Sequence, residues 1–279
     1  MITRFAPSPT GHLHKGHAWS ALTAYENARQ KGGKFLLRIE DIDFNRCKST
    51  HSLQILEDLD WLGIEWEEPV RVQSEHIDQY SRAATELLER GLLYPCFCTR
   101  KDIQREIEAA GQAPQGSEGP LYPGTCKHIP SEERAKRIES GEPHALRLNL
   151  DKAMAEINSP LTWTDTLHGP QEARPQILGD IVIVRKDVGT SYHLAVVFDD
   201  GLQQVTDIVR GVDLFDSTHI HCVLQKLLGL PTPTYHHHGL LTDENGNRLA
   251  KRDRSITLKS LRDAGITAKQ LKTELGFAV

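Results

Sequence analysis

Short apolar runs alternate with stretches of helical periodicity in the N-terminal part of the chain. The pattern predicts two strands, at residues 2–6 and 34–39, and three helices, at residues 17–30, 52–62 and 77–88. Prolines and glycines, at Pro7, Pro9 and Gly11, separate the first strand from the first helix, and Gly32 and Gly33 end that helix. Strand, loop, helix, strand and helix in this order are typical of a parallel sheet covered by helices.

After Leu93 the pattern changes. Residues 111–126 are rich in Gly, Pro and Ser and have no sustained periodicity, which indicates an insertion with its own small fold. Further along, the sequence predicts antiparallel strands at 145–150 and 161–167, buried strands at 181–185 and 194–198, a helix at 217–228 capped by Ser217 and ended by Gly229, and two short helical stretches after a basic loop.

These elements predict an α/β fold in which an inserted α+β subdomain interrupts a Rossmann-like parallel sheet, followed by a short helical C-terminal tail. The expected boundaries place the first half of the sheet domain at 1–93, the insertion at 94–179, the second half at 180–247 and the loop with its tail at 248–279.

Composition narrows the class of protein. Of 279 residues, 38% are apolar and 25% charged, which is typical of a globular chain, and no apolar run is long enough to span a membrane. The N-terminus lacks the features of a secretory signal, so a cytoplasmic location is expected. A net charge of −5 gives no support for RNA binding, although a local basic patch is sufficient for phosphate contacts.

Three of the five cysteines, Cys96, Cys98 and Cys126, lie within 31 residues, which favours a metal site over disulfides. Thiolates are zinc ligands, and a tetrahedral site needs one more. Tyr122 and His128 are the alternatives, of which imidazole is the more common ligand. The consecutive residues 236–238 are also histidines, but neighbouring residues on a strand point in different directions, so we expect no shared ion there.

The segment from Ser8 to His17 lies between the first predicted strand and helix, where a helix N-terminus attracts phosphate. Its residues include His14 and His17, which can donate hydrogen bonds to phosphate oxygens, and Gly16, which permits close approach of a ligand to the backbone. The sequence lacks both the glycine-rich dinucleotide-binding motif GxGxxG and the phosphate loop GxxxxGK(S/T) of nucleoside triphosphatases. The segment therefore predicts a different kind of phosphate site.

Four strings in this order resemble glutamyl-tRNA synthetases, which are class I enzymes with an HIGH signature. The strings are Arg4–Gly11 running into His14-Lys15-Gly16-His17, Arg38–Asp43, Tyr192–Asp200 and Val209–Asp213. Because they are spread along the sequence, the resemblance extends over nearly the whole chain. The second class I signature, KMSKS, is matched by Arg248-Leu249-Ala250-Lys251-Arg252, with Arg248, Ala250 and Arg252 departing from the family pattern.

The resemblance implies that glutamate is activated with ATP and Mg²⁺ to glutamyl-adenylate and then transferred to RNA. It places ATP at His14, Gly16, His17 and Lys251, and the amino acid at Arg4, Ala6, Ser8, Glu40, Tyr192 and Arg210. An arginine is a bidentate donor for carboxylate, and we expect Arg210 to bind the side-chain carboxylate and Glu40 the ammonium group. His14, His17 and Lys251 would stabilise charge during the reaction.

Only 27 residues follow Arg252, too few for an anticodon-binding domain. In its length the chain resembles the short paralogues that attach glutamate to the queuosine base of tRNA(Asp). Their zinc pattern, CxC followed by YxxxC, selects Tyr122 over His128 as the fourth ligand of a structural zinc. The alternatives are the catalytic part of an enzyme that charges tRNA(Glu), and a non-catalytic paralogue that binds tRNA or glutamate. A monomer is expected.

Overall fold

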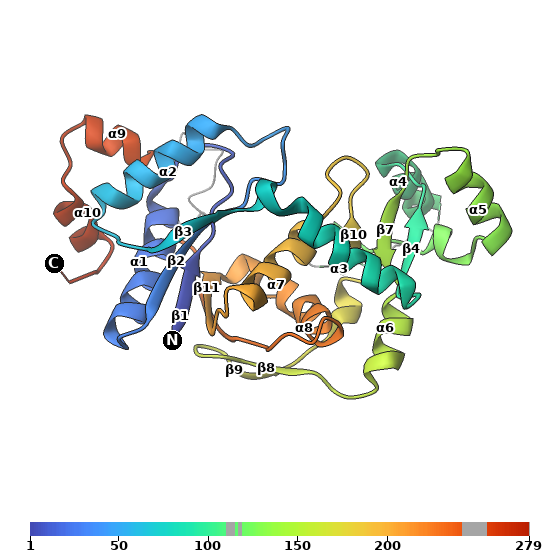
Figure 1. The fold of residues 1–279 in the computed structure, drawn as a ribbon. Coiled ribbons are helices and arrows are strands. Elements are labelled where there is room, and N and C mark those ends of the chain that lie inside the picture. The colour runs from blue at the N-terminus through green and yellow to red at the C-terminus, as the bar shows by residue number, and fades with distance from the viewer. Residues whose placement is uncertain (110–114, 117–118, 242–255, 279) are drawn as a thin grey trace.

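The computed structural model describes residues 1–109, 115–116, 119–241 and 256–278. Two sets of hydrogen-bonded strands lie edge to edge and together form one mostly parallel sheet at the centre of the described chain (Figure 1). They meet where β11 (Asp207–Gly211) runs beside β1 (Ile2–Phe5), and the hydrogen bond from Thr206 N to Ile2 O, 2.9 Å, lies at this junction. The strands in spatial order are β3 (Glu67–Val72), β2 (Lys34–Ile39), β1 (Ile2–Phe5), β11 (Asp207–Gly211), β12 (Thr234–His238), β8 (Thr162–Asp165) and the antiparallel edge strand β9 (Gly169–Glu172).

The strand order reverses between β1 and β11. From β1 the chain continues to β2 and β3 on one side, whereas from β11 it continues to β12 on the other. In open α/β sheets, the crevice at such a switch point is the usual place for a ligand, at the carboxyl ends of the strands. The fold therefore directs attention to the residues that follow Phe5 and Val209.

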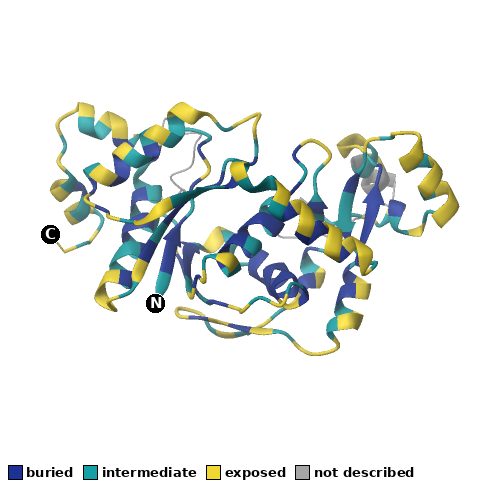
Figure 2. Cartoon of the chain, in the orientation of Figure 1, coloured by how far each residue is buried: buried dark blue, intermediate teal, exposed yellow. Residues whose placement is uncertain are grey.

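The helices form a layer on each side of the sheet. α1 (Lys15–Gln30) lies against β1, β2 and β11, and its buried face is mostly alanine, which lets the helix approach the strands closely. α7 (Tyr192–Leu202), α8 (Ser217–Leu227) and α3 (Ile77–Glu89) pack together on the other side. Ten of the eleven residues of α8 are buried, so it is the central helix of that layer (Figure 2).

The structure corrects the prediction of a buried strand at 194–198, because these residues form the middle of α7. A short apolar run has the same composition in a buried strand and in a buried helix, so periodicity alone cannot separate the two. In the structure the hydroxyl of Ser191 accepts the backbone N–H of Leu194 and caps the helix. Ser217 is likewise not the cap of α8, since the N-cap residue is Asp216.

The predicted strands and helices of residues 1–93 are present with small shifts at their ends. One helix among them, α2 (Ser49–Trp61), begins three residues before the predicted start. β3 has no counterpart among the predicted strands, because Glu67, Glu68 and Pro69 interrupt any apolar run. It is an edge strand of the sheet, where proline is tolerated.

A second, antiparallel sheet lies beside the first in Figure 1 and consists of β4 (Leu93–Cys96), β7 (Ala145–Leu148) and β10 (Val182–Val184). β10 lies beyond the predicted end of the insertion at residue 179, yet it pairs with β7 inside the insertion. Conversely, β8 lies inside the predicted insertion and pairs with β12 of the main sheet. Strand pairing therefore connects the insertion to both halves of the chain around it. The remaining elements of this region are α4 (Arg100–Ala109), β5 (Gln115–Gly116), β6 (Gly119–Pro120), α5 (Ser131–Glu139) and α6 (Leu150–Ile157).

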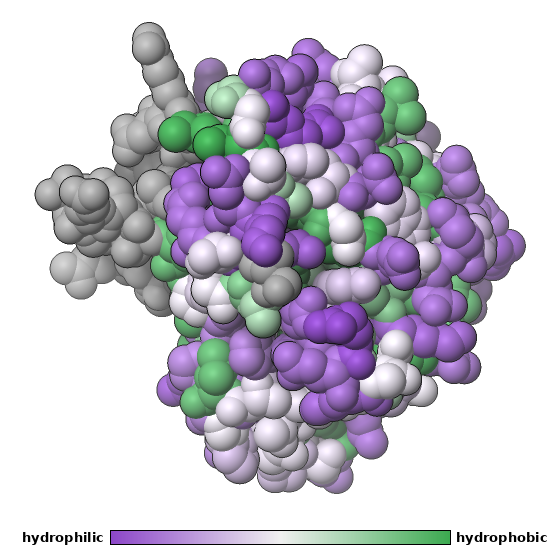
Figure 3. All heavy atoms as spheres, turned by 90° about the vertical axis from the view of Figure 1, so that its left-hand side faces the viewer, coloured by the Kyte–Doolittle hydropathy of each residue, from purple (hydrophilic) through white to green (hydrophobic). Residues whose placement is uncertain are grey.

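The C-terminal tail forms the two predicted short helices, α9 (Leu258–Asp263) and α10 (Ala268–Glu274), at the opposite end of the molecule from α5 (Figure 1). The tail contacts the start of α1: Leu258 N donates to Leu13 O at 2.8 Å, and Lys15 forms an ion pair with Glu274. Figure 3 shows this end of the molecule as a mainly hydrophilic surface. No helix in the described ranges has the length and apolar character needed to cross a membrane.

Candidate active site and metal centre

A cavity of about 410 Å³ opens at the switch point between β1 and β11. Seven of the residues predicted from the sequence line this one cavity: Arg4, Ala6, Ser8, His17, Glu40, Tyr192 and Arg210. They come from β1, the loops after β1 and β2, the start of α1, the start of α7 and the end of β11. His14 and Gly16 lie on the adjoining turn, and Lys251 lies outside the described residues.

Two histidines cap the N-terminus of α1. His14 is the N-cap: its Nδ1 accepts the backbone N–H of Gly16 at 3.1 Å, while Nδ1 of His17 accepts the backbone N–H of His14 at 3.2 Å. Because Nδ1 is the acceptor in both rings, Nε2 carries the proton and is the hydrogen-bond donor. A Cβ on Gly16 would lie 3.0 Å from Cε1 of His14, so glycine leaves room for that ring.

Arg210 occupies the β11 side of the cavity and is 5% exposed. Its Nε donates to Nε2 of His237 at 3.0 Å, Nη1 donates to Tyr192 Oη at 3.4 Å, and Nη2 donates to Thr218 Oγ1 at 2.6 Å and to Leu214 O at 3.1 Å. Burial and the nearby Arg210 hold the pKa of His221 far below its usual range, so this ring also faces the guanidinium in its neutral form. All of these partners are uncharged.

A second charged group lies on the β1 side of the cavity. Arg4 donates to Asp200 through Nε at 3.0 Å, and Arg38 donates to Asp200 at 2.8 Å and to Glu40 at 3.2 Å. Burial alone would raise the pKa of Asp200, but Arg4 and Arg38 lower it below its ordinary value. Burial raises the pKa of Glu40 above its ordinary value, although both guanidiniums lie near it.

The two sides of the cavity differ in their charge balance. Arg4 and Arg38 each have a carboxylate partner, whereas Arg210 has no ion pair with any residue in the described ranges. A buried cation without a counter-ion is costly, and an anionic ligand would relieve that cost. Arg210 is therefore the group in this cavity that is best suited to bind a ligand carboxylate.

Several residues that shape the site were outside the sequence prediction. Arg38 and Asp200 stand inside the motif strings quoted above, but the sequence does not show that they pair with each other or with Arg4. His237 belongs to the histidine run at 236–238, whose rings separate as the alternation of a strand requires. The rings of these three residues bond to different partners, His236 to Thr166, His237 to Asp165 and Arg210, and His238 to Ser20.

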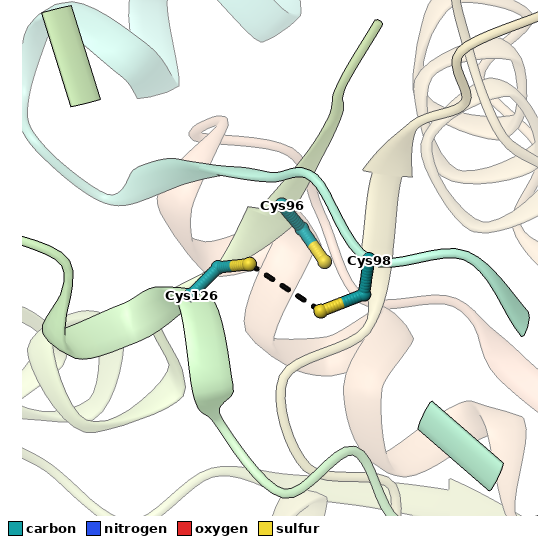
Figure 4. A group of neighbouring side chains, drawn as sticks. All are labelled: Cys96, Cys98 and Cys126. Carbon is teal, nitrogen blue, oxygen red and sulfur yellow. Dashed lines mark hydrogen bonds between the residues drawn. The ribbon is translucent and has the colours of Figure 1, made fainter. Parts of the chain in front are cut away.

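The three clustered cysteines meet in space. Cys96 and Cys98 stand at the end of β4, and Cys126 belongs to the short 3-10 helix η2 (Thr125–His128). Figure 4 shows the three sulfurs directed toward one another. All three Sγ atoms lie within 4.8 Å of each other, and those of Cys98 and Cys126 are 3.4 Å apart.

This geometry fits a zinc ion. Zn–S bonds of about 2.3 Å in a tetrahedron place sulfurs about 3.8 Å apart, close to the spacing seen here. Tyr122 Oη lies 3.4 Å from the sulfur of Cys96 and 3.6 Å from that of Cys98, so it joins the group. His128 is exposed and belongs to no described cluster of metal-ligating side chains. The arrangement favours Tyr122 as the fourth ligand.

Comparison with known proteins identifies the family to which the chain belongs. Residues 1–275 match the family described as tRNA synthetases class I (E and Q), catalytic domain. A crystal structure of a glutamate tRNA ligase from Elizabethkingia meningosepticum in complex with its amino acid is similar, with a TM-score of 0.78 and 30% identity over 91% of this chain. The chain spans about half of that structure, 52%. The fold and the match define the catalytic fold of a class I tRNA synthetase, and the chain belongs to that class.

Its relatives narrow the assignment. The chain is 47% identical to the glutamyl-Q tRNA(Asp) synthetase of Rhodobacter capsulatus, over 99% of this chain and 100% of that protein. It is 41% identical to the glutamyl-Q tRNA(Asp) synthetase of Symbiobacterium thermophilum, over 99% of this chain and 86% of that protein. The glutamate–tRNA ligase of Aquifex aeolicus is 37% identical, and the match covers 55% of its length. Within the class, the chain belongs to the glutamyl-Q tRNA(Asp) synthetase family.

Proposed function

We propose that this protein activates L-glutamate with ATP and transfers the glutamyl group to the queuosine base of tRNA(Asp). The observation that carries the proposal is the cavity between β1 and β11, where Arg210, which has no ion pair within the described ranges, and the carboxyl of Glu40 face the same space. An amino acid with a carboxylate in its side chain matches both charges, because this carboxylate can bind Arg210 and its ammonium group can bind Glu40. Glutamate is such a ligand, and the full-length relatives bear the name of this activity.

The charge balance of the cavity supports a division of roles between the arginines. Arg210 binds the side-chain carboxylate, since its charge has no ion-pair partner among the described residues. Arg4 has one edge occupied by Asp200 and contributes positive potential on the opposite side of the cavity. Glu40 binds the ammonium group, Tyr192 forms the wall beside Arg210, and Ala6 and Ser8 line the cavity along the loop after β1.

The first reaction needs no nucleophile from the protein, because the α-carboxylate of glutamate attacks the α-phosphate of ATP and pyrophosphate leaves. Positioning and charge stabilisation are the main contributions that a protein makes to such a step. The Nε2–H groups of His14 and His17 suit phosphate oxygens, and Gly16 keeps the turn compact. Mg²⁺ bound to the nucleotide would offset phosphate charge. We assign Lys251 to the same task because its place in the sequence matches the second class I signature; it lies outside the described residues.

In the second reaction, a hydroxyl of the queuosine base attacks the activated carbonyl. The new ester forms as the bond to AMP breaks, AMP leaves with the electron pair, and the hydroxyl proton is released to solvent. We propose that the protein carries out both steps as a monomer.

We also propose that Cys96, Cys98, Tyr122 and Cys126 bind one structural Zn²⁺. When bound, the ion would hold η2 and the Tyr122 segment against the end of β4. The contacts of these four side chains join segments that are distant in sequence, and the site is separate from the residues that line the glutamate cavity.

Two assays test the proposal. Exchange of labelled pyrophosphate into ATP should require glutamate and should not be supported by glutamine or aspartate. Transfer of labelled glutamate should occur to tRNA(Asp) that carries queuosine and not to the same tRNA without the modified base. Charging of tRNA(Glu) instead would identify an ordinary glutamyl-tRNA synthetase, and tRNA binding without exchange would identify a non-catalytic paralogue.

A further inference from the structure

A continuous chain of buried hydrogen bonds stands behind Arg210. Its Nε donates to Nε2 of His237 at 3.0 Å, and Nδ1 of the same imidazole lies 2.7 Å from Oδ2 of Asp165. The side chains of His237 and Asp165 are both fully buried. Asp165 stands at the end of β8, 72 residues before His237 on β12. Neither residue lines the cavity that holds Arg210, so neither can touch a ligand there.

These contacts permit only one form of the His237 ring. The Nε of an arginine is always a donor, so Nε2 of His237 must be the acceptor. Nδ1 then carries the proton and donates to the carboxylate of Asp165. The opposite tautomer would bring two N–H groups together at the Arg210 contact and would place a lone pair against a carboxylate. An imidazolium would preserve the contact with Asp165 but would also set its second N–H against Arg210.

Asp165 is itself held rigidly. Its Oδ1 accepts the backbone N–H groups of Leu167 and His168 at 2.8 and 2.9 Å, and its Oδ2 accepts the backbone N–H of His237 at 3.0 Å. Both oxygens are therefore fixed as acceptors. An amide in place of the carboxylate would present its NH₂ group to an N–H donor in either orientation.

We infer that Asp165 and His237 are positioning residues for glutamate recognition: the carboxylate selects the Nδ1–H tautomer of His237, and this ring orients the guanidinium of Arg210 toward the ligand. The inference rests on the proposed role of Arg210 in binding the side-chain carboxylate. The imidazole connects the negative charge of Asp165 to Arg210 without a direct ion pair. Arg210 thus keeps its charge available for a ligand.

The kinetic test separates this role from simple packing. In glutamate-dependent pyrophosphate exchange, His237→Leu leaves Nε of Arg210 without its partner and should raise KM for glutamate by about tenfold or more, with KM for ATP unchanged. Asp165→Asn should have a similar effect, since it favours the wrong tautomer of His237. A merely structural role would lower kcat and thermal stability while leaving the ratio of the two KM values as in the wild type.

A second test asks whether a conservative substitution of His237 restores the KM for glutamate. The amide of His237→Gln can place an N–H toward Asp165 and an oxygen toward Arg210, so its KM for glutamate should stay within about threefold of the wild type. His236→Gln is the matched control, because that ring bonds to Thr166 and faces away from Arg210. A Gln variant as impaired as the Leu variant, or an equal rise in KM for ATP, would overturn the inference.

A third measurement does not depend on activity. Nitrogen NMR of the histidine rings, assigned to His237 by the loss of its signals in His237→Gln, should show Nδ1 protonated and Nε2 unprotonated in the wild-type protein. A protonated Nε2 would refute the hydrogen-bond chain even if the enzyme is fully active. Wild-type protein without glutamate-dependent exchange would instead refute the proposed function, and the ring nitrogens would still decide whether Asp165 sets the tautomer.

Discussion

Arg4 and Asp200 form a buried ion pair between positions 196 residues apart, with Nε and Oδ1 separated by 3.0 Å. The pair connects the first strand of the sheet to the end of α7. Asp200 also accepts a bond from Arg38, so three side chains from distant parts of the chain share one buried network. Arg4 is thus part of an ion-pair network, whereas Arg210 has only neutral hydrogen-bond partners among the described residues.

Arg4→Met should therefore destabilise the fold, because Asp200 loses one of its two buried cations. Removing one partner of a buried pair costs about 3 kcal/mol of unfolding free energy. Urea titration of both proteins would measure the difference. Arg29→Met is the matched control: Arg29 pairs with Glu26 on the surface of α1, and its loss should change stability by less than about 1 kcal/mol. Equal effects of the two substitutions would contradict the argument.

Arg210→Ala should weaken glutamate binding and leave the protein cooperatively folded. A charge-assisted hydrogen bond to a carboxylate contributes about 1.5–3 kcal/mol, so the loss of the contact with the substrate should weaken glutamate binding by about tenfold to a hundredfold. Calorimetric titration with glutamate gives the affinity, and the thermal transition reports the fold. Unchanged affinity in a folded variant would show that Arg210 does not hold the substrate.

Cys98→Ser should lower both the zinc content and the thermal stability of the purified protein. The wild type should contain about one zinc per chain, since the donor set of Cys96, Cys98, Tyr122 and Cys126 suits one tetrahedral ion. Elemental analysis together with a melting curve measures both effects. Full zinc occupancy in the variant would exclude Cys98 as a ligand.

The same measurement separates the two candidates for the fourth ligand. Tyr122→Phe should reduce zinc retention during dialysis against a chelator, whereas His128→Ala should retain zinc as the wild type does, because His128 is exposed. The reverse result would assign the fourth position to His128.

Glutamate activation should fall at acidic pH because Glu40 is needed as an anion. Burial raises the pKa of Glu40 above its ordinary 4.5, although Arg38 and Arg4 oppose the shift. The free enzyme therefore gains a proton on Glu40 at pH values where an ordinary glutamate is still ionised, and kcat/KM for glutamate should decline as pH falls through that raised value. Pyrophosphate exchange against pH checks this. In Glu40→Gln the activity should be low and this limb of the profile should be missing.

Asp58 should make the fold less stable as pH rises. It is buried and forms an ion pair with Arg262 of the tail, in which Nη2 lies 3.0 Å from Oδ1, but neither carboxyl oxygen has a hydrogen bond of good geometry in the described chain. Burial raises the pKa of Asp58 from 3.8 to about 6, with Arg262 opposing. Because the folded pKa is the higher one, the neutral carboxyl is favoured in the fold, and its contribution to stability is lost as pH rises from 3.8 to about 6.

The variant Asp58→Asn tests this sign. Relative to the wild type, its unfolding free energy should increase by about 1–2 kcal/mol between acidic and neutral conditions, after allowance for solvent screening and for the lost attraction to Arg262. Urea titrations at pH 4 and pH 7, values chosen to lie at about the two ends of the titration, would measure it. A difference that does not vary with pH would contradict the assignment.

Local signals in the sequence were sufficient for much of the fold and for part of the site. The loop and helix start at Ser8–His17 are a local feature of the sequence, and the structure places His17 in the same cavity as Glu40 and Arg210. The Cys96–Cys98 and Tyr122–Cys126 spacings are also local, and these side chains do meet. The roles assigned to Lys251 and to the cavity residues remain predictions.

Other features depend on contacts that no local pattern specifies. The helix α7 has an apolar run that a buried strand would share, so its type follows from packing against α3 and α8. The pairing of Arg4 with Asp200 and of His237 with Asp165 depends on where distant strands meet. Sequence motifs thus located the residues, but the partners that set their charge and orientation required the structure.

The neighbouring strands β1 and β11 emerge from the ribosome far apart in time. A nascent chain that has released only its N-terminal half carries His17 and Glu40 but not Arg210, so the cavity is incomplete. Under the proposed role of Arg210, translation must pass β11 before glutamate can bind. The enzyme is then inactive until most of its chain has been synthesised.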